Sequence, residues 1–129
     1  MYEKEIERAA EHFKALLARQ LERNDAIKAQ GDFIDYASLD KIVIGVCGGD
    51  GIGPIITKQA ADVLAYLLKD DVAKGKIEFR YIDGLTIENR IAHMKPIPDD
   101  VLVELKSCHV ILKGPTTTPQ AGDGRPNIE

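Results

Sequence analysis

The chain has 129 residues, of which 44% are hydrophobic and 29% are charged, and its formal net charge is -4. This balance allows one compact α/β domain, and it gives no reason to expect a nucleic-acid-binding or membrane-binding surface. No apolar run approaches the roughly 20 residues that span a bilayer, and residues 1–30 lack the apolar core of a signal peptide. Cys47 and Cys108 each lie in an apolar, strand-like run, so we expect buried, reduced thiols and a cytoplasmic protein.

The first segment, from Tyr2 to about Lys28, contains no glycine or proline and is expected to form one amphipathic helix. Apolar residues recur along it at spacings of three or four, namely Ile6, Ala10, Phe13, Leu17 and Leu21. Gly31 would end this helix, and a connector would extend to Asp40. The apolar stripe has to pack against this domain or against another chain, and the sequence leaves both open. We therefore predict a helix with a connector over residues 1–40 and a separate domain over residues 41–129.

The second unit begins with a continuous apolar run from Lys41 to Cys47, which predicts a strand covered on both faces in a parallel sheet. A glycine-rich turn follows from Gly48 to Gly53, and Pro54 suits the first turn of a helix. This helix is expected to carry one apolar face, formed by Ile56, Ala60, Val63, Leu64, Leu67 and Leu68.

Further strands and helices alternate along the rest of the chain. Residues 76–83 alternate apolar and polar side chains, which predicts a strand at an edge or half exposed. Residues 85–94 and 98–106 have helical patterns, and residues 109–112 form a third apolar run. Strands separated by helices imply parallel crossover connections, so the predicted fold class is α/β with a parallel sheet.

The glycine-rich turn lies between a strand and a helix, a geometry that presents backbone N–H groups to an anionic ligand. It is not the dinucleotide-binding fingerprint, because Pro54 stands where the last glycine would be needed, and no phosphate-loop lysine follows. Asp50 could bind a ligand hydroxyl, although an aspartate in such a turn more often bonds its own backbone. The three histidines show neither metal-ligand spacing nor a nucleophile partner, so we expect structural roles for them.

Three motifs together resemble the isocitrate/isopropylmalate dehydrogenase family, whose members are NAD(P)-dependent β-decarboxylating dehydrogenases. They are Gly49-Asp50-Gly51-Ile52-Gly53-Pro54, Pro98-Asp99-Asp100-Val101-Leu102 and Leu112-Lys113-Gly114-Pro115-Thr116-Thr117-Thr118-Pro119. The resemblance covers residues 41–129 and implies the amino-terminal part of that family's fold. One departure is Ile55, which stands where the family usually has a glutamate after Gly-Pro, so the helix loses an acid from its first turn.

The resemblance also implies roles for individual residues. Lys113 favours the isocitrate branch, and Lys113 and Thr118 would line the substrate side of the site. Ile52, Thr116, Thr117 and Thr118 would lie on the cofactor side, next to NAD or NADP. A lysine and clustered hydroxyls suit a polycarboxylate, because they supply a positive charge and orientable donors. The alternative is that Thr116 to Pro119 form an ordinary polar loop with no role in binding.

The family's reaction needs further parts, which the resemblance places after Glu129: arginines that clamp carboxylates, a Tyr and Lys pair, and carboxylates for Mg²⁺ or Mn²⁺. We therefore expect no catalytic residue and no metal ligand in this chain. We expect activity only when a complementary chain supplies the rest of the fold. The active form would be an oligomer, and its substrate a small hydroxy acid. The leading hypothesis is a small subunit, or split amino-terminal portion, of an isocitrate dehydrogenase-like enzyme. The alternatives are a noncatalytic regulatory or interaction subunit, an isopropylmalate or homoisocitrate dehydrogenase-like portion, and an artificial fragment.

Overall fold

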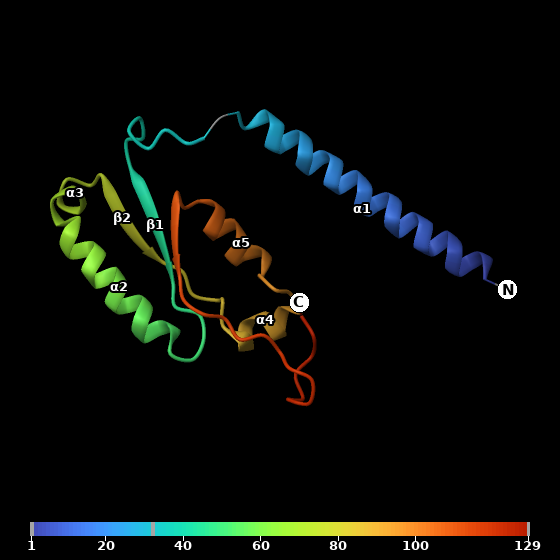
Figure 1. Cartoon of the computed structure of the whole chain (residues 1–129). Coiled ribbons are helices and arrows are strands. Elements are labelled where there is room, and N and C mark those ends of the chain that lie inside the picture. Colours follow the sequence, from blue (N-terminus) through green and yellow to red (C-terminus); the bar gives the residue numbers. More distant parts are fainter. Residues whose placement is uncertain (1, 32, 129) are drawn as a thin grey trace. The chain divides into compact units, whose positions relative to one another are not determined.

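A computed structural model describes residues 2–31 and 33–128, which form two compact units, Met1–Asp35 and Tyr36–Glu129. The first unit contains one long helix, and the second contains the strands and the remaining helices (Figure 1). No helix among the described residues is long and apolar enough to cross a membrane.

The first unit consists of α1, Glu3–Ala29, followed by a short connecting segment. The predicted amphipathic helix is therefore confirmed. Gln30 is its C-cap, and Gly31 follows with φ +71, the left-handed conformation that commonly ends a helix and that glycine adopts without strain. Within its own unit α1 buries none of its residues.

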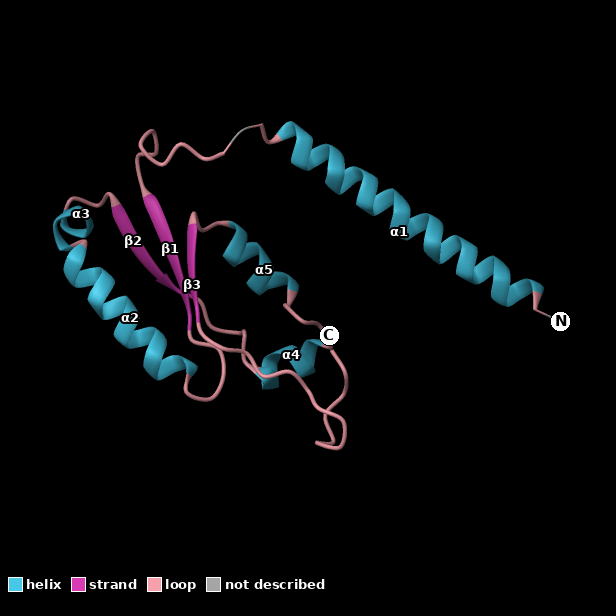
Figure 2. Ribbon diagram, viewed as in Figure 1, coloured by secondary structure: helices cyan, strands magenta, loops and turns pink. Residues whose placement is uncertain are grey.

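The second unit is built on a parallel three-stranded sheet in the order β2-β1-β3 (Figure 2). The strands are β1 (Ile42–Cys47), β2 (Ile77–Tyr81) and β3 (Val110–Lys113). In the register, Val46 of β1 pairs with Tyr81 of β2 and with Leu112 of β3. The expected α/β fold with a parallel sheet is confirmed, and β2 lies at an edge of the sheet, as its alternating pattern predicted.

Helices cover both faces of this sheet, which explains why β1 is apolar throughout. On one face Ile44 and Val46 pack with Ala61 of α2, Gly53–Leu67. On the other face Cys47 packs with Val101 and Leu105 of α5, Asp99–Lys106. Figure 1 shows α2 and α5 on opposite sides of the strands.

Both cysteines are free thiols, and Cys47 is completely buried while Cys108 is partly buried. Burial is the main cause that raises the pKa of the Cys47 thiol above its ordinary value of 9.0, so it stays protonated at neutral pH. The expected burial is therefore confirmed for Cys47, whereas Cys108 is only partly buried.

The face of α2 that packs on the sheet is not the apolar face that the sequence indicates. The buried residues are Gly53, Thr57 and Ala61, whereas Val63 and Leu67 are exposed. Ile56 and Ala60 are also exposed, and Leu64 and Leu68 are half-buried. Small side chains four residues apart let the helix backbone approach the sheet closely, while Ile56, Val63 and Leu67 lie on the outer side and Leu68 packs at the margin of the core.

The remaining elements differ little from those predicted. A short helix that the sequence did not indicate, α3 (Lys69–Ala73), follows α2. The helix α4, Ile87–His93, begins after Thr86, whose hydroxyl accepts a hydrogen bond from Asn89 N. His109 lies just before β3 and has a structural role, because its Nδ1 accepts a hydrogen bond from Val43 N at 3.0 Å.

Candidate functional site

The candidate site lies where the three parallel strands end, because their carboxyl ends meet at one edge of the sheet. Two loops run together beyond this edge, the glycine loop after β1 and the loop that begins at Gly114 after β3. Gly114 N donates to Cys47 O at 2.8 Å, and Asp50 N donates to Pro115 O at 2.8 Å. Backbone hydrogen bonds therefore continue from the sheet into the loops and hold them side by side.

The glycines of this region are required by the close approach of the two loops. A Cβ atom added at Gly49 would lie 2.0 Å from Pro115 O, and one at Gly114 would lie 2.1 Å from Gly48 O. At Gly53 the added atom would lie 2.2 Å from Gly48 O within the same loop and 3.0 Å from Pro115 Cδ of the other loop. The distances near 2 Å are far shorter than any non-bonded contact, so Gly49 and Gly114 serve the packing of one loop on the other, and Gly53 serves mainly the tight turn of its own loop.

Asp50 connects three segments of the site. Its Oδ1 accepts a hydrogen bond from Ile87 N, and its Oδ2 accepts one from Thr117 N, both at 2.8 Å. Ile87 is the first residue of α4, so the carboxylate also lies at the positive end of that helix. Each oxygen therefore binds a backbone N–H of another segment. Neither role considered for Asp50 from the sequence, a bond to its own turn or to a ligand hydroxyl, describes these contacts.

Arg90 is a buried residue for which the sequence predicted no role in the site. It is only 3% exposed, its Nε donates to Pro96 O, and its guanidinium donates to Thr117 O, both at 2.8 Å. Arg90 and Asp50 thus hold the carbonyl and the N–H of Thr117 respectively. The only signal in the sequence is that Arg90 follows the apolar Ile87 by three residues, which places both on one helix face.

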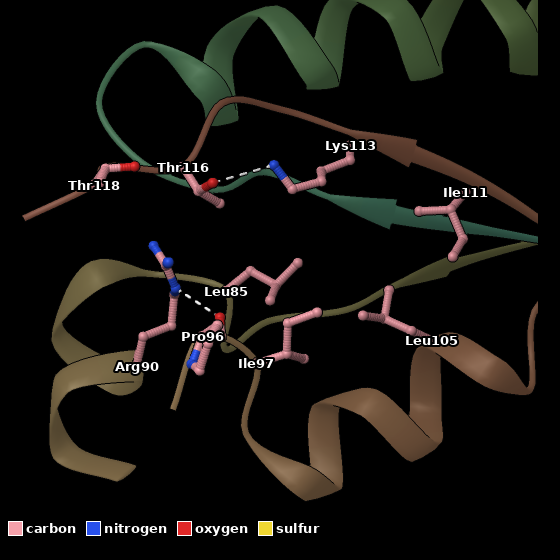
Figure 3. Close-up of a pocket in the computed structure, with 9 residues that line it drawn as sticks. All are labelled: Leu85, Arg90, Pro96, Ile97, Leu105, Ile111, Lys113, Thr116 and Thr118. Carbon is pink, nitrogen blue, oxygen red and sulfur yellow. Dashed lines mark hydrogen bonds between the residues drawn. The ribbon is translucent and has the colours of Figure 1, made fainter. Parts of the chain in front are cut away.

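A cavity of about 330 Å³ lies beside the loop that follows β3 (Figure 3). Lys113, Thr116 and Thr118 line one side of it in Figure 3, and Arg90 lies across from them. The rest of the lining is mainly apolar and comprises Leu85, Pro96, Ile97, Leu105 and Ile111. The cavity therefore combines an apolar floor with hydroxyl groups and positive charge, which suits an anionic organic ligand.

Lys113 is held at the edge of this cavity by its own loop. Its Nζ donates to Gly114 O at 2.9 Å and to Thr116 Oγ1 at 3.3 Å. An ammonium group has three donors, so one N–H remains for a ligand. The hydroxyl of Thr116 can turn its own hydrogen toward the cavity while it accepts from Lys113.

The structure brings together three of the residues predicted for the site, because Lys113, Thr116 and Thr118 line the same cavity. Thr117 lies between two of them, but it is not among the lining residues, and its backbone groups are bound by Asp50 and Arg90. Ile52 also lies outside the cavity lining, 63% exposed at the N-cap of α2. Within residues 2–31 and 33–128, no group of three or more His, Cys, Asp or Glu residues could hold a metal ion.

The fold is an α/β unit whose two loops lie side by side at the carboxyl ends of parallel strands, the edge where open α/β sheets commonly bind ligands. The family model for isocitrate/isopropylmalate dehydrogenase matches residues 43–128. The chain therefore belongs to the isocitrate/isopropylmalate dehydrogenase family, and it corresponds to part of the amino-terminal region of that fold.

Two relatives are both named 3-isopropylmalate dehydrogenase. The protein from Chromohalobacter salexigens is 35% identical over 75 residues, which cover 58% of this chain and 20% of the relative. The protein from Bacillus subtilis is 30% identical over 77 residues, which cover 60% of this chain and 20% of the relative. The chain thus spans about a fifth of the length of the relatives it matches. No solved structure matches it significantly.

Proposed function

We propose that residues 41–129 provide part of the substrate and nicotinamide site of an isocitrate dehydrogenase-like enzyme, which converts isocitrate to 2-oxoglutarate with NAD or NADP. The proposal rests mainly on the single cavity shared by Lys113, Thr116 and Thr118. The chain spans about a fifth of the relatives' length. The other parts of the fold are proposed to lie on a complementary polypeptide, which would cover the exposed apolar residues Val63, Leu67, Val110 and Ile111. The free thiols Cys47 and Cys108 support a reducing, cytoplasmic location.

The residues of this chain would bind and orient the substrate. Lys113 would donate a charge-assisted hydrogen bond to a substrate carboxylate, which is stronger than a bond between neutral groups. The hydroxyls of Thr116 and Thr118 would orient the remaining polar groups of the substrate or of the nicotinamide amide. Asp50 and Arg90 would hold the intervening Thr117 peptide, so that both threonines keep their positions when the ligand binds.

The cofactor and the metal ion differ in how well this chain fits them. The threonine hydroxyls suit a nicotinamide amide, and Ile52 offers an exposed apolar side chain for its ring, so these residues would hold the cofactor. NAD or NADP would accept the hydride from the substrate alcohol. The described residues do not fit Mg²⁺ or Mn²⁺, because they form no cluster of carboxylates at this edge. The metal ligands would therefore belong to the complementary polypeptide.

A second candidate is an isopropylmalate dehydrogenase-like activity. It is favoured by the names of the two relatives and by the apolar floor of the cavity, where Leu85, Ile97 and Ile111 could cover a branched alkyl group. The isocitrate assignment depends on Lys113, whose charge would suit the additional carboxylate of isocitrate. A third possibility, a noncatalytic interaction subunit, would use the same cavity only for binding.

The test is an assay of the chain in its assembly with the complementary polypeptide. Hydride transfer is followed as nicotinamide absorbance with Mg²⁺, with NAD or NADP, and with isocitrate or 3-isopropylmalate. Preferential oxidation of isocitrate is the expected result. A preference for 3-isopropylmalate would replace the substrate assignment, and an assembly inactive with both substrates would overturn the enzymatic role.

In the active assembly, we expect Lys113→Ala to lower kcat/KM for isocitrate by about tenfold or more, because a charge-assisted contact to a carboxylate is lost. Lys106→Ala is the matched control, since Lys106 is an exposed lysine at the end of α5, away from the carboxyl edge of the sheet. Equal kinetics of the Lys113 variant and the wild-type assembly would contradict the role of Lys113.

A further inference from the structure

The apolar stripe of α1 has no partner within its own unit. The helix has 27 residues, none of them buried. Ile6 and Phe13 are 66% and 64% exposed, and Leu17, Leu21 and Ile27 are exposed to a similar degree. Helices in water gain most of their stability from packing an apolar face, so a helix of this kind needs a surface to cover its stripe.

The charges along α1 indicate what kind of surface this is. Between Glu3 and Glu11 acidic residues outnumber basic residues by four to two, whereas between Lys14 and Lys28 basic residues outnumber acidic residues by four to two. A parallel pair of such helices would place like halves together. An antiparallel pair places each acidic half against a basic half. The positive end of each helix dipole then lies beside the negative end of the other, which is also favourable.

We infer that α1 pairs in an antiparallel manner with α1 of a second copy of this chain. The two stripes form the core of the pair, with Phe13 and Leu17 near its centre. Because Glu5 and Arg23 are separated by about five complete helical turns, both project from the same flank of the stripe. Corresponding flanks meet in an antiparallel pair, so Glu5 approaches the partner's Arg23, and twofold symmetry repeats this contact.

This pairing does not depend on the dehydrogenase activity, because it uses only residues of α1. Its consequence is that two copies of the α/β unit are joined through their amino-terminal helices. Two other occupants of the stripe, the chain's own α/β unit and a lipid surface, predict a monomer in solution. The oligomeric state therefore distinguishes them from the proposed pair.

The first experiment is sedimentation equilibrium of the full chain at micromolar concentrations. The wild-type chain is expected to dimerise, and Leu17→Asp is expected to raise the dissociation constant by at least about 100-fold, because it places a charge in the apolar core of the pair. Ala15→Asp is the matched control, since it adds the same charge on the opposite, exposed face of α1. A monomeric wild-type chain, or a dimer that Leu17→Asp leaves intact, would overturn the proposal.

The second experiment tests the orientation of the pair. Glu5→Arg and Arg23→Glu should each weaken the dimer about fivefold, since each turns two attractive contacts into repulsive ones. The double variant E5R/R23E should restore the wild-type affinity, because it exchanges the two charges. In a parallel pair Glu5 and Arg23 would lie about five helical turns apart and could not contact each other, so exchanging their charges would restore no contact. A double variant as weak as the single variants therefore rejects the antiparallel arrangement.

Discussion

At the scale of single residues, the peptide of Thr117 is the most firmly held point of the candidate site. Its N–H is bound by Asp50 after β1, and its carbonyl by Arg90 of α4, each at 2.8 Å. Side chains from two separate segments thus fix the backbone between Thr116 and Thr118. The cost of losing such a contact is high because the remaining polar group is left without its partner.

We expect Asp50→Asn to lower the free energy of unfolding by about 2 kcal/mol, because an amide has one acceptor oxygen where the carboxylate uses two. Urea denaturation followed by circular dichroism measures the change. Asp62→Asn is the control, since Asp62 forms only an exposed ion pair with Lys58 and its loss should leave the unfolding free energy nearly unchanged. Equal stability of the two variants would show that Asp50 does not hold the loops together.

Alanine substitutions at Gly49 and Gly51 distinguish the cost of backbone strain from the cost of steric overlap. Both have positive φ values, +70 and +59, but only Gly49 has atoms of another loop at the position of an added Cβ. Gly51→Ala should therefore cost about 1 kcal/mol of unfolding free energy through strain alone. Gly49→Ala should cost more than about 3 kcal/mol, because Pro115 and its loop must move. Similar losses in urea denaturation would contradict the close packing of the loops.

At the scale of secondary-structure elements, α2 shows that the largest apolar residues need not mark the buried face of a helix. Its buried face consists of glycine, threonine and alanine, and its exposed face carries Ile56, Val63 and Leu67. The exposed residues would be covered if the rest of a dehydrogenase fold packed against α2. This apolar surface supports the proposed association with a complementary polypeptide.

Two substitutions in α2 test which of its faces packs on the sheet. Ala61 is 1% exposed and Val63 is 59% exposed. We expect Ala61→Asp to lower the unfolding free energy of the isolated chain by more than about 3 kcal/mol, because it buries a charge against the sheet. Val63→Asp should change it by less than about 0.5 kcal/mol. The reverse order in urea denaturation would show that the apolar face is the packed one.

At the scale of the whole molecule, the sheet of the α/β unit is incompletely covered at its outer strand β3. Its outer strand β3 leaves Val110 and Ile111 exposed, and the cavity opens beside this strand. Exposed strand edges and apolar patches are sites where further chain normally packs. This observation supports the proposal that a second polypeptide extends the sheet and completes the site.

The order of strands and helices, the parallel sheet and the family were predictable from the sequence. The run from Lys41 to Cys47 predicted a strand covered on both faces, and the motifs around Gly49 and Lys113 predicted two loops at one edge. Local patterns suffice for these features, because residue spacing and turn chemistry act between near neighbours in the chain. The location of Lys113, Thr116 and Thr118 in one cavity agrees with the predicted site, while their roles in binding stay a prediction.

The sequence by itself determined the elements other than α3, the sheet type and the family of this protein. Only the tertiary structure decided that Arg90 is buried, that Asp50 bonds to Ile87 and Thr117, and that α2 packs through Thr57 and Ala61. The physical reason is that these contacts join residues far apart in the chain, whose meeting depends on how the helices pack on the sheet. The residue spacing within one segment does not indicate which backbone group of a distant segment will bond to a given side chain.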